Sequence, residues 1–408
     1  MAETGNTQVN VKAIGLISGA HLYSHFYILL LPPLFPVLTG RLDVGFTELG
    51  FSITVFSLMT GLTQTPIGFL VDRVGARGLL IAALVLQSLA FIAIAAAPSY
   101  GMLLAMMVIA GLANAVYHPA DYSILNGSVG EAHIGRAFSV HTASGFFGGF
   151  LAPALVLPLS TVIGWQWAVG VCAATGIGMA LILVLGAGAL QDADNRDADL
   201  SNSKGGVAVL LSFPVLMGLL FYVGISTSGH GVSDFSVSAL GEMYPATLTT
   251  LGIVLLAYLF ANPVGVLVGG WIADSIKRHD VFAAACFVGV ALPLFAIAGF
   301  QLPLALVAAG LFIVGFLNGV VSPSRDMLIR AMTPPGQMGK VFGFVSTGFN
   351  IGGIIAPPAF GWLLDQGSPT SVYWGAGIVA LLTVPTVLVT GLQGRKAADR
   401  WVQEDATA

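Results

Sequence analysis

The chain has 408 residues and a formal net charge of −4, and 56% of its residues are apolar while only 8% are charged. A typical soluble domain has about 25% charged residues, so this composition excludes an ordinary soluble protein. The few basic residues form no patch, and we expect no nucleic-acid partner. Cys172 and Cys286 lie inside apolar runs, which indicates neither a disulfide framework nor a metal site.

Apolar runs of about 20 residues recur along the whole chain, and a helix of that length crosses a bilayer. Lipid offers the backbone no hydrogen-bond partner, so helices are the expected spanning structure. The polar start, Met1–Val11, shows no cleavable signal pattern. We expect an all-α membrane protein whose twelve transmembrane helices lie at about 13–39, 46–71, 78–97, 101–126, 135–163, 165–190, 207–237, 246–273, 281–299, 302–331, 338–364 and 371–392.

One polar internal segment divides the chain into two halves. We expect an N-terminal six-helix bundle at 1–190, a cytoplasmic linker at 191–206 and a C-terminal six-helix bundle at 207–408. When the sequence is shifted by 204 positions, Gly111–Pro153 aligns with Gly315–Pro357 without a gap, and ten of the 43 positions are identical. Matching Gly, Asn and Pro residues at one offset indicate two pseudo-symmetric halves, which is a recurring transporter architecture.

The distribution of Lys and Arg predicts the orientation of the chain in the membrane. If the N-terminus is cytoplasmic, 13 of the 15 Lys and Arg residues fall in predicted cytoplasmic segments. Of the other two, Arg41 lies in an outer loop and Arg325 lies within a helix. We therefore expect a multi-pass protein of the inner (plasma) membrane with both termini in the cytoplasm.

A charged motif stands between the second and third predicted helices. It reads Gly68-Phe-Leu-Val-Asp72-Arg73-Val-Gly75-Ala-Arg77. The motif resembles the signature loop of the major facilitator superfamily, whose members are membrane transporters. We expect a cytoplasmic gating loop in which Gly68 lets two helices approach closely, while Asp72 faces a helix N-terminus and pairs with an arginine.

Weaker motifs occur in both halves. The run Gly270-Trp-Ile-Ala-Asp274 is a partial repeat of the gating-loop motif, and Asp274 is therefore predicted to be a gating residue. Gly148–Pro153 resembles the antiporter motif of the superfamily, and the same pattern returns at Gly352–Pro357. Because the pattern is present in both halves, we favour helix packing and bending over a mark of antiport.

Polar residues inside the apolar helices indicate the candidate binding site. A charge at the bilayer centre costs about 2.5–3.5 kcal/mol, so such residues usually face an interior cavity. They collect in the first, fourth, seventh and tenth predicted helices, which line the central cavity in the superfamily. The set comprises His21, Tyr23, His25, Asn114, His118, Asp121, His230, Asp234, Asn318 and Arg325.

Arg325 is the most informative member of this set. Its guanidinium is always charged, and its planar fork suits a carboxylate, a phosphate or a sulfonate. We expect it to bind an anionic substrate; the alternative is a structural ion pair with Asp121 or Asp326 that holds the halves together. Asp326 follows Arg325 directly and is expected to point elsewhere around the helix. The predicted walls of the same substrate site are His21, Tyr23, His25, Asn114, His118 and Asn318.

Two His–Asp pairs are candidate proton carriers, namely His118 with Asp121 and His230 with Asp234. Histidine can change charge between about pH 5 and 8, and partial burial can bring a carboxyl group into that range. The alternative is a hydrogen-bonded helix pair, and it is strongest for Asp234, near the predicted outer end of its helix.

Other chemistries find little support in the sequence. There is no nucleophile beside a base, no phosphate loop and no metal set, so we expect neither an enzyme nor a cofactor. The H-x-x-x-H pair of His21 and His25 lacks a shape specific to metal, and Arg325 in the same cavity would repel a cation.

A closer resemblance is carried by Val116–Tyr122, which contains the pair His118-Pro119, and by the later run Gly135–Ser139. Both segments resemble the fosmidomycin-resistance branch of the superfamily. The resemblance implies a proton-driven bacterial exporter of a small anionic or amphipathic compound. We predict a monomeric secondary transporter that works by alternating access. The alternatives are a proton-coupled organic-anion uptake symporter and a membrane receptor or scaffold that no longer transports.

Overall fold

The computed structural model describes residues 10–192, 209–334 and 337–407. Within these residues the chain is helical without strands, and twelve segments are long and apolar enough to cross a membrane. The predicted all-α fold with twelve transmembrane helices is confirmed. Most of the predicted linker at 191–206 and of the polar start Met1–Val11 lies outside the described residues.

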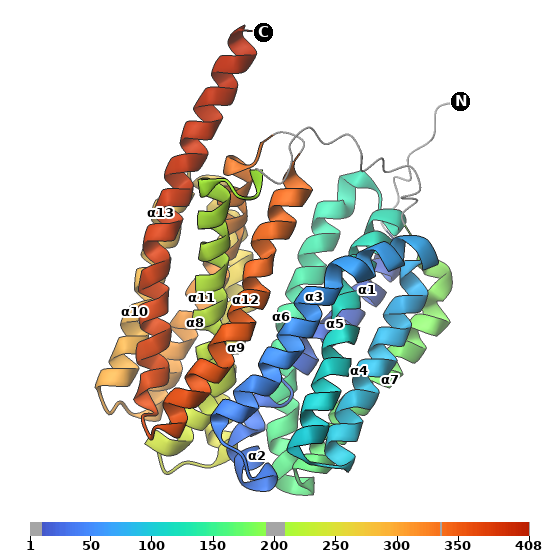
Figure 1. The fold of residues 1–408 in the computed structure, drawn as a ribbon, viewed down its shortest axis with the longest axis vertical. Coiled ribbons are helices and arrows are strands. Elements are labelled where there is room, and N and C mark those ends of the chain that lie inside the picture. Colours follow the sequence, from blue (N-terminus) through green and yellow to red (C-terminus); the bar gives the residue numbers. More distant parts are fainter. Residues whose placement is uncertain (1–9, 193–208, 335–336, 408) are drawn as a thin grey trace. The chain divides into compact units, whose positions relative to one another are not determined.

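The helices fall into two series (Figure 1). The first series is α1 (Val11–Ile28), α2 (Phe35–Leu42), α3 (Phe46–Val74), α4 (Ala76–Ala96), α5 (Tyr100–Ser128), α6 (Glu131–Ile163) and α7 (Trp165–Gly186), with the 3₁₀ turns η1 (Pro32–Leu34) and η2 (Ala187–Ala189). The second series is α8 (Phe213–Met243), α9 (Leu248–Ser275), α10 (His279–Gly299), α11 (Leu304–Met332), α12 (Met338–Asp365) and α13 (Thr370–Thr407). The chain divides into an N-terminal unit, 1–198 with 247–252, and a C-terminal unit, 199–246 with 253–408.

The first membrane span is interrupted, although the sequence predicts one helix at 13–39. α1 ends at Ile28, and the chain passes through η1 before α2 begins. Pro32 and Pro33 explain the break, because proline provides no N–H for a helical hydrogen bond and its ring clashes with the preceding turn.

α8 lies further along the chain than the predicted helix at 207–237. It begins at Phe213, with Pro214 in its first turn, where the missing N–H of proline has no cost. It ends only at Met243, so Asp234 lies nine residues before the end of the helix and is buried. The interpretation of Asp234 as a residue near the helix end is therefore wrong.

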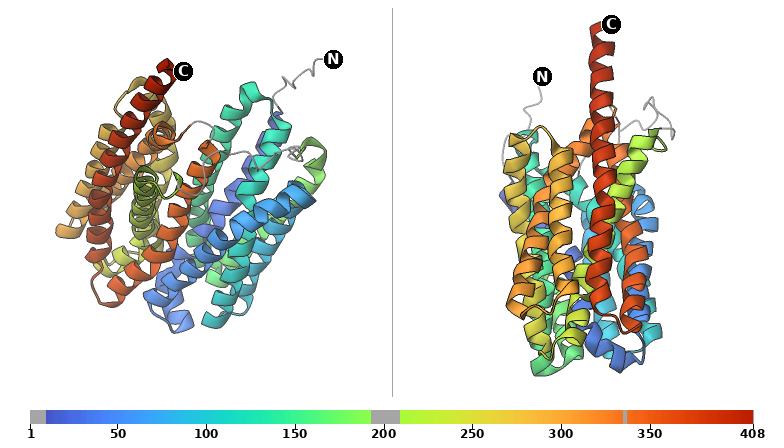
Figure 2. Two further views of the ribbon diagram at one scale, coloured as in Figure 1. Left: turned by 45° about the horizontal axis from the view of Figure 1, so that its top comes forward. Right: turned by 90° about the vertical axis from the view of Figure 1, so that its left-hand side faces the viewer.

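α13 continues past the predicted end at about residue 392 and reaches Thr407. The membrane-spanning part ends at Arg395. The following residues include Ala, Arg, Gln and Glu, which favour a helix but are too polar for lipid. In Figure 2 this helix extends beyond its neighbours in the C-terminal unit.

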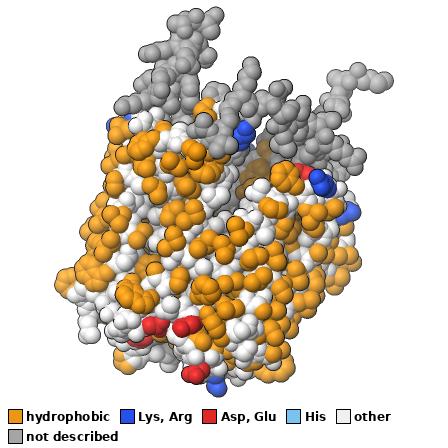
Figure 3. Space-filling model, viewed as in Figure 1, with side chains coloured by type: hydrophobic (Ala, Val, Ile, Leu, Met, Phe, Trp, Pro, Cys, Tyr) orange, Lys and Arg blue, Asp and Glu red, His pale blue; other side chains and the backbone are white. Residues whose placement is uncertain are grey.

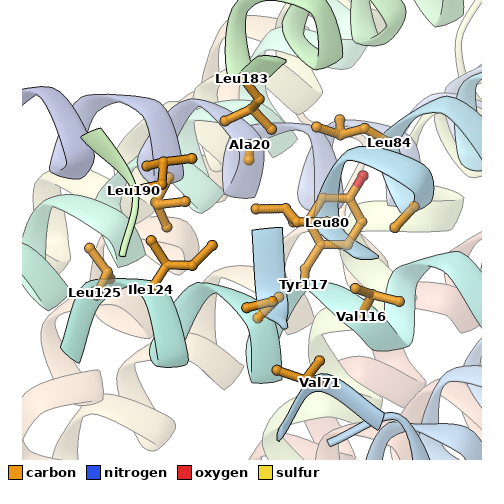
Figure 4. Packing of buried hydrophobic residues seen from close by; sticks show 14 of the residues in the cluster. Ala20, Val71, Leu80, Leu84, Val116, Tyr117, Ile124, Leu125, Leu183 and Leu190 are labelled. Atoms are coloured by element: carbon orange, nitrogen blue, oxygen red, sulfur yellow. The ribbon is translucent and has the colours of Figure 1, made fainter. Parts of the chain in front are cut away.

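A continuous apolar core holds α1, α4, α5 and α7 of the N-terminal unit together. Tyr117 of α5 is fully buried in it, and Leu80 and Leu84 of α4 pack around the same region (Figure 4). Such a core is close-packed and resists small displacements. It therefore holds the polar side chains on the other faces of α1 and α5 in defined positions.

Glycine brings two helix pairs into backbone contact at corresponding places in the two units. Gly148 of α6 lies against the carbonyl of Leu22 in α1, where a Cβ atom would overlap that oxygen. At the corresponding place, a Cβ atom on Gly352 of α12 would overlap the side chain of Ser226 in α8 and come within 3.0 Å of the backbone nitrogen of Thr227. Both glycines belong to the repeated motif that resembles the antiporter motif, and these contacts support its interpretation as a helix-packing device.

The outer surface is apolar. Val162, Leu185 and Trp271 have exposed fractions of 80%, 77% and 75%. On the face drawn in Figure 3, apolar side chains cover most of the flanks, and the visible charged side chains lie toward the two ends. Exposed apolar surface of this extent requires a lipid environment.

Candidate functional site

Four histidines and one aspartate from three helices meet in the N-terminal unit. His21 and His25 lie one turn apart on α1, His118 and Asp121 lie on α5, and His141 lies on α6. We call these five residues the histidine cluster. Because α1 contacts both α5 and α6, side chains far apart in the sequence come together here.

The rings of the histidine cluster touch one another. The ring centroid of His21 lies 3.8 Å from that of His141 in a stacked arrangement, 5.0 Å from that of His25 and 5.1 Å from that of His118. Asp121 is fully buried, and its Oδ2 lies 3.2 Å from Nδ1 of His21 and 3.8 Å from Nε2 of His141. The carboxylate thus contacts His21 and His141. It does not pair with His118, its predicted partner on the same helix.

Several polar atoms of the cluster are buried without a hydrogen-bond partner among the described residues. They are Nδ1 of His21, Nδ1 of His118, both ring nitrogens of His141 and both carboxylate oxygens of Asp121. The contact between His21 and Asp121 is short but poorly directed for a hydrogen bond. An unsatisfied buried polar group costs about 1–3 kcal/mol, so this arrangement favours a bound species that satisfies these atoms.

Two small features hold the cluster in place. Gly145 of α6 lies so close to α1 that a Cβ atom there would come within 2.8 Å of the rings of both His21 and His25. One turn after His21 on α1, Ser24 donates a hydrogen bond to Oδ1 of Asn114 in α5 at 2.9 Å. Asn114, a predicted wall residue, therefore also fixes α1 against α5.

The structure changes the membership of the predicted site. His141 joins it, although it is the single histidine of the predicted helix at 135–163 and has no periodic polar partner there to reveal its role. Tyr23 is a predicted wall residue, but its ring lies 5.6 Å from that of Phe26 and 5.9 Å from that of Tyr27, beside the apolar core. Only the packing of α6 against α1 brings His141 to the cluster.

Arg325 lies in an aromatic setting in the C-terminal unit. Its guanidinium carbon is 4.9 Å from the ring centroid of Tyr222 in α8 and 5.4 Å from that of Phe349 in α12. Its Nε donates to Oδ1 of Asp326 at 2.8 Å, and the Tyr222 hydroxyl donates to the same oxygen at 3.1 Å. The Arg325 side chain is only 16% exposed, whereas that of Asp326 is 48% exposed.

The expectation that Asp326 points away from Arg325 is wrong. Successive side chains on a helix diverge by about 100°, but the long arginine side chain reaches back to its neighbour. The resulting pair lies within α11, so it cannot hold the two halves together. Asp121, the other candidate partner, has its ion-pair contacts inside the histidine cluster.

A second His–Asp pair is well formed on α8. Nδ1 of His230 lies 2.7 Å from Oδ2 of Asp234, and the Ser233 hydroxyl donates to Oδ1 at 2.7 Å. Both carboxylate oxygens therefore have partners. In the same unit, Asn318 of α11 donates a long hydrogen bond of 3.5 Å to the hydroxyl of Tyr258 in α9.

The predicted gating loop is short and tied to the end of α7. Gly75 alone separates α3 from α4, and its φ of +92° favours glycine. Asp192 accepts a hydrogen bond from the first amide of α4, that of Ala76, at 3.2 Å, and Arg77 donates to the carbonyl of Ala187 at 3.2 Å. These contacts connect the start of α4 with the segment that follows α7.

Other predicted gating residues lie at helix ends. A Cβ atom on Gly68 would meet nothing within 4 Å, so the close helix approach expected there is not found within the described residues. The side chains of Asp72, Arg73 and Asp274 are exposed at the ends of α3 and α9.

The sequence interpretation missed Asp280, which makes the corresponding connection in the C-terminal unit. This buried residue in the first turn of α10 accepts two hydrogen bonds from Arg278, at 3.0 and 3.2 Å. Arg395 of α13 donates to it at 2.8 Å. The hydrogen bonds to Asp280 raise the pKa of the exposed Arg278 guanidinium. Thus each unit connects the start of its third spanning helix, α4 or α10, with the end of its sixth, α7 or α13.

Comparison with known proteins agrees with this architecture. A family model described as Major Facilitator Superfamily matches residues 17–241 and 216–408. The fosmidomycin resistance protein of Escherichia coli is 24% identical over 402 residues, which cover 95% of each chain. The probable nitrate/nitrite transporter NarK2 of Mycobacterium tuberculosis is 25% identical over 399 residues, or 93% of this chain and 94% of that one. A bacterial homologue of the human lysosomal transporter Spinster, in an inward-facing and unoccupied conformation, has a similar fold, with a TM-score of 0.71, 14% identity and coverage of 98% and 99%.

Proposed function

This chain belongs to the major facilitator superfamily and is a multi-pass membrane transporter rather than an enzyme, and from this starting point we propose that it exports a small organic anion by alternating access, coupled to protons. In transporters of this architecture the two halves move against each other around a site near the bilayer midplane.

The observation that carries the anion proposal is the setting of Arg325. A guanidinium has five N–H donors in a plane, and Asp326 takes the one on Nε. Further donors are therefore available for the paired oxygens of a carboxylate, phosphonate or sulfonate. Tyr222 and Phe349 hold the guanidinium against their ring faces, so it is positioned before a substrate arrives. His21, His25, Tyr23, Asn114, His118 and Asn318 stay predicted wall residues.

The names of two relatives support an anionic substrate and export. Nitrate and nitrite, which NarK2 is named for, are anions. A relative named for resistance to fosmidomycin supports export rather than uptake. Each name describes that relative, and for this chain it adds weight to the anion class and to efflux.

Proton coupling is best supported by His230 and Asp234. The pair shares a hydrogen bond of 2.7 Å within α8, and Asp234 is buried well inside the helix. A buried pair of this kind can take up a proton in one state of the transporter and release it in another. We further propose that the protein is monomeric and lies in the inner membrane. Its two termini would lie in the cytoplasm, as the distribution of Lys and Arg predicts.

The anion proposal is tested by ligand-induced stabilisation of the purified protein, since a ligand that binds only the folded state raises its melting temperature. Small carboxylates, phosphonates, sulfonates, lipophilic cations and neutral drugs are compared on the wild type, Arg325→Ala and Arg330→Ala. Arg330 is an exposed residue of the same helix and provides the matched control. We expect anions to stabilise the wild type and Arg330→Ala but not Arg325→Ala. Equal stabilisation of all three by cationic or neutral drugs alone would favour a multidrug exporter instead.

The coupling is tested with an anion identified in that screen, in proteoliposomes that carry a pH gradient. Proton antiport drives the substrate toward the acidic compartment, whereas proton symport drives it toward the alkaline one. Accumulation in an acidic lumen supports coupled export. Accumulation in an alkaline lumen would identify the uptake symporter, and equal distribution in both cases would exclude coupling to protons.

A further inference from the structure

We infer that His21, His118, His141 and Asp121 form a binding site for a single divalent transition-metal ion of the zinc, nickel and cobalt class. The four residues come from α1, α5 and α6 and lie wholly within the N-terminal unit. This inference goes beyond the proposed anion transport and does not depend on Arg325.

The ligand chemistry defines the class of ion. Imidazole nitrogen is the preferred ligand of zinc, nickel and other late divalent metals, and a carboxylate completes such sets in many proteins. A set of oxygens would select magnesium or calcium instead, and no thiolate is present in this group. Three imidazoles and one carboxylate supply the four ligands of a tetrahedral site.

The spacing of the atoms fits a small ion. Two ligands of a tetrahedral zinc ion lie about 3.4 Å apart, given metal–ligand distances of about 2.0–2.1 Å. Oδ2 of Asp121 lies 3.2 Å from Nδ1 of His21 and 3.8 Å from Nε2 of His141, which brackets that value. The ligand atoms of the three histidines lie within 4.8 Å of one another, so rotation of side chains closes the remaining distance.

The polar atoms of this group lack the partners that a purely structural cluster would have. Asp121 is fully buried, yet neither of its oxygens accepts a hydrogen bond from a described residue. Both ring nitrogens of His141 are likewise buried without a hydrogen-bond partner among the described residues. The pair formed by His230 and Asp234 provides a contrast within the same protein, because both of its carboxylate oxygens are hydrogen-bonded. A metal ion would satisfy several atoms of the histidine cluster at once.

The sequence offers two arguments against a metal site, and the structure removes both of them. The sequence pattern lacks His141, which stacks on His21 and supplies a further imidazole. The charge of Arg325, which was expected to repel a cation, is offset by an ion pair with Asp326, whose Oδ1 lies 2.8 Å from Nε of Arg325. Within the site, the Asp121 carboxylate offsets part of the charge of a divalent ion.

The test is a titration of tag-free protein, dialysed against a chelator, with Co²⁺ as a spectroscopic probe for the zinc site. Binding is followed by calorimetry and by the visible absorption of tetrahedral Co²⁺. We compare the wild type with His141→Gln, His118→Gln and Asp121→Asn. The matched control is His279→Gln, a histidine of the C-terminal unit whose ring lies 3.3 Å from the hydroxyl of Ser324.

We expect one Co²⁺ per chain in the wild type and in His279→Gln, and a loss of affinity of about tenfold or more in the three cluster variants. Metal that binds all five proteins equally, or a wild type without saturable binding, would overturn the inference. Because a cluster variant could lose its fold, X-ray absorption of the zinc-loaded wild type gives a second readout. Outer-shell scattering from about three imidazoles supports the site, and a first shell without imidazole contradicts it.

Discussion

Nε of Arg325 lies 2.8 Å from Oδ1 of Asp326, the residue that follows it in α11. The hydroxyl of Tyr222 donates to the same carboxylate oxygen from α8. The carboxylate therefore occupies one side of the guanidinium and competes with any anion that approaches it. Asp326 is the more exposed partner, so in the proposed binding of an anion it is the one that would move away.

Asp326→Asn should increase the affinity for an anionic substrate. The substitution removes a negative charge at ion-pair distance from Arg325 and keeps the shape of the side chain. We expect a gain of about tenfold, which corresponds to about 1.4 kcal/mol, in a calorimetric titration with an anion from the screen. Tyr222→Phe removes a donor to the same oxygen but no charge, and a much smaller change is expected. A weaker anion affinity in Asp326→Asn, together with a lower melting temperature, would instead identify a structural ion pair.

Asp234→Asn should uncouple transport from protons. The variant keeps a polar side chain of the same size beside His230 but cannot take up and release a proton at that position. In proteoliposomes we expect substrate exchange to persist while accumulation driven by a pH gradient falls by about tenfold or more. Glu242→Gln changes an exposed carboxylate near the end of the same helix and should behave as the wild type. Gradient-driven accumulation at the wild-type level in Asp234→Asn would assign the coupling to another residue.

Gly148→Ala should destabilise the protein, because the added methyl group would overlap the backbone of Leu22 where α6 meets α1. Overpacking of this kind costs about 1–3 kcal/mol. Gly135 lies on the same helix, and a Cβ atom there meets nothing within 4 Å. Gly135→Ala should therefore be neutral or stabilising by up to about 1 kcal/mol, since alanine favours a helix. Thermal unfolding in detergent compares the two variants, and equal melting temperatures would exclude a packing role for Gly148.

Asp280→Asn should loosen the attachment of α13 to α10. The substitution removes the charge that pairs with Arg278 and Arg395, and the Asp280 side chain is buried. Arg395 is 41% exposed, so solvent screening limits its coupling to Asp280 to about 1 kcal/mol. A double-mutant cycle of Asp280→Asn and Arg395→Gln, read by melting temperature, measures this term. Strictly additive effects would show that the pair contributes nothing to stability.

The sequence predicted the fold because a membrane restricts the possible structures. Runs of about 20 apolar residues admit one regular spanning structure with an internally satisfied backbone, so the number and approximate places of the helices follow directly. The differences concern helix boundaries. They arise at Pro32, at Pro214 and in the polar end of α13, where local chemistry rather than hydropathy decides the start or end of a helix.

The candidate site was predicted only in part. Spacing on one helix groups His230 with Asp234, and this pair is present with a hydrogen bond. The same reasoning groups His118 with Asp121, but the carboxylate contacts His21 and His141, which come from other helices. Contacts between helices depend on how each helix is rotated and how closely it packs, and helical periodicity contains neither quantity.

By itself, the sequence determined an all-α membrane protein of twelve helices and, through the motif at Gly68–Arg77, its superfamily. The 204-residue repeat predicts two halves. Only the tertiary structure decided which polar side chains share an environment. Gly145 allows the rings of His21 and His25 to lie against α6, and this approach adds His141 to the cluster. The reach of a long side chain pairs Arg325 with its own neighbour in α11. Both outcomes depend on close packing and side-chain length in three dimensions, which the order of residues along one helix does not specify.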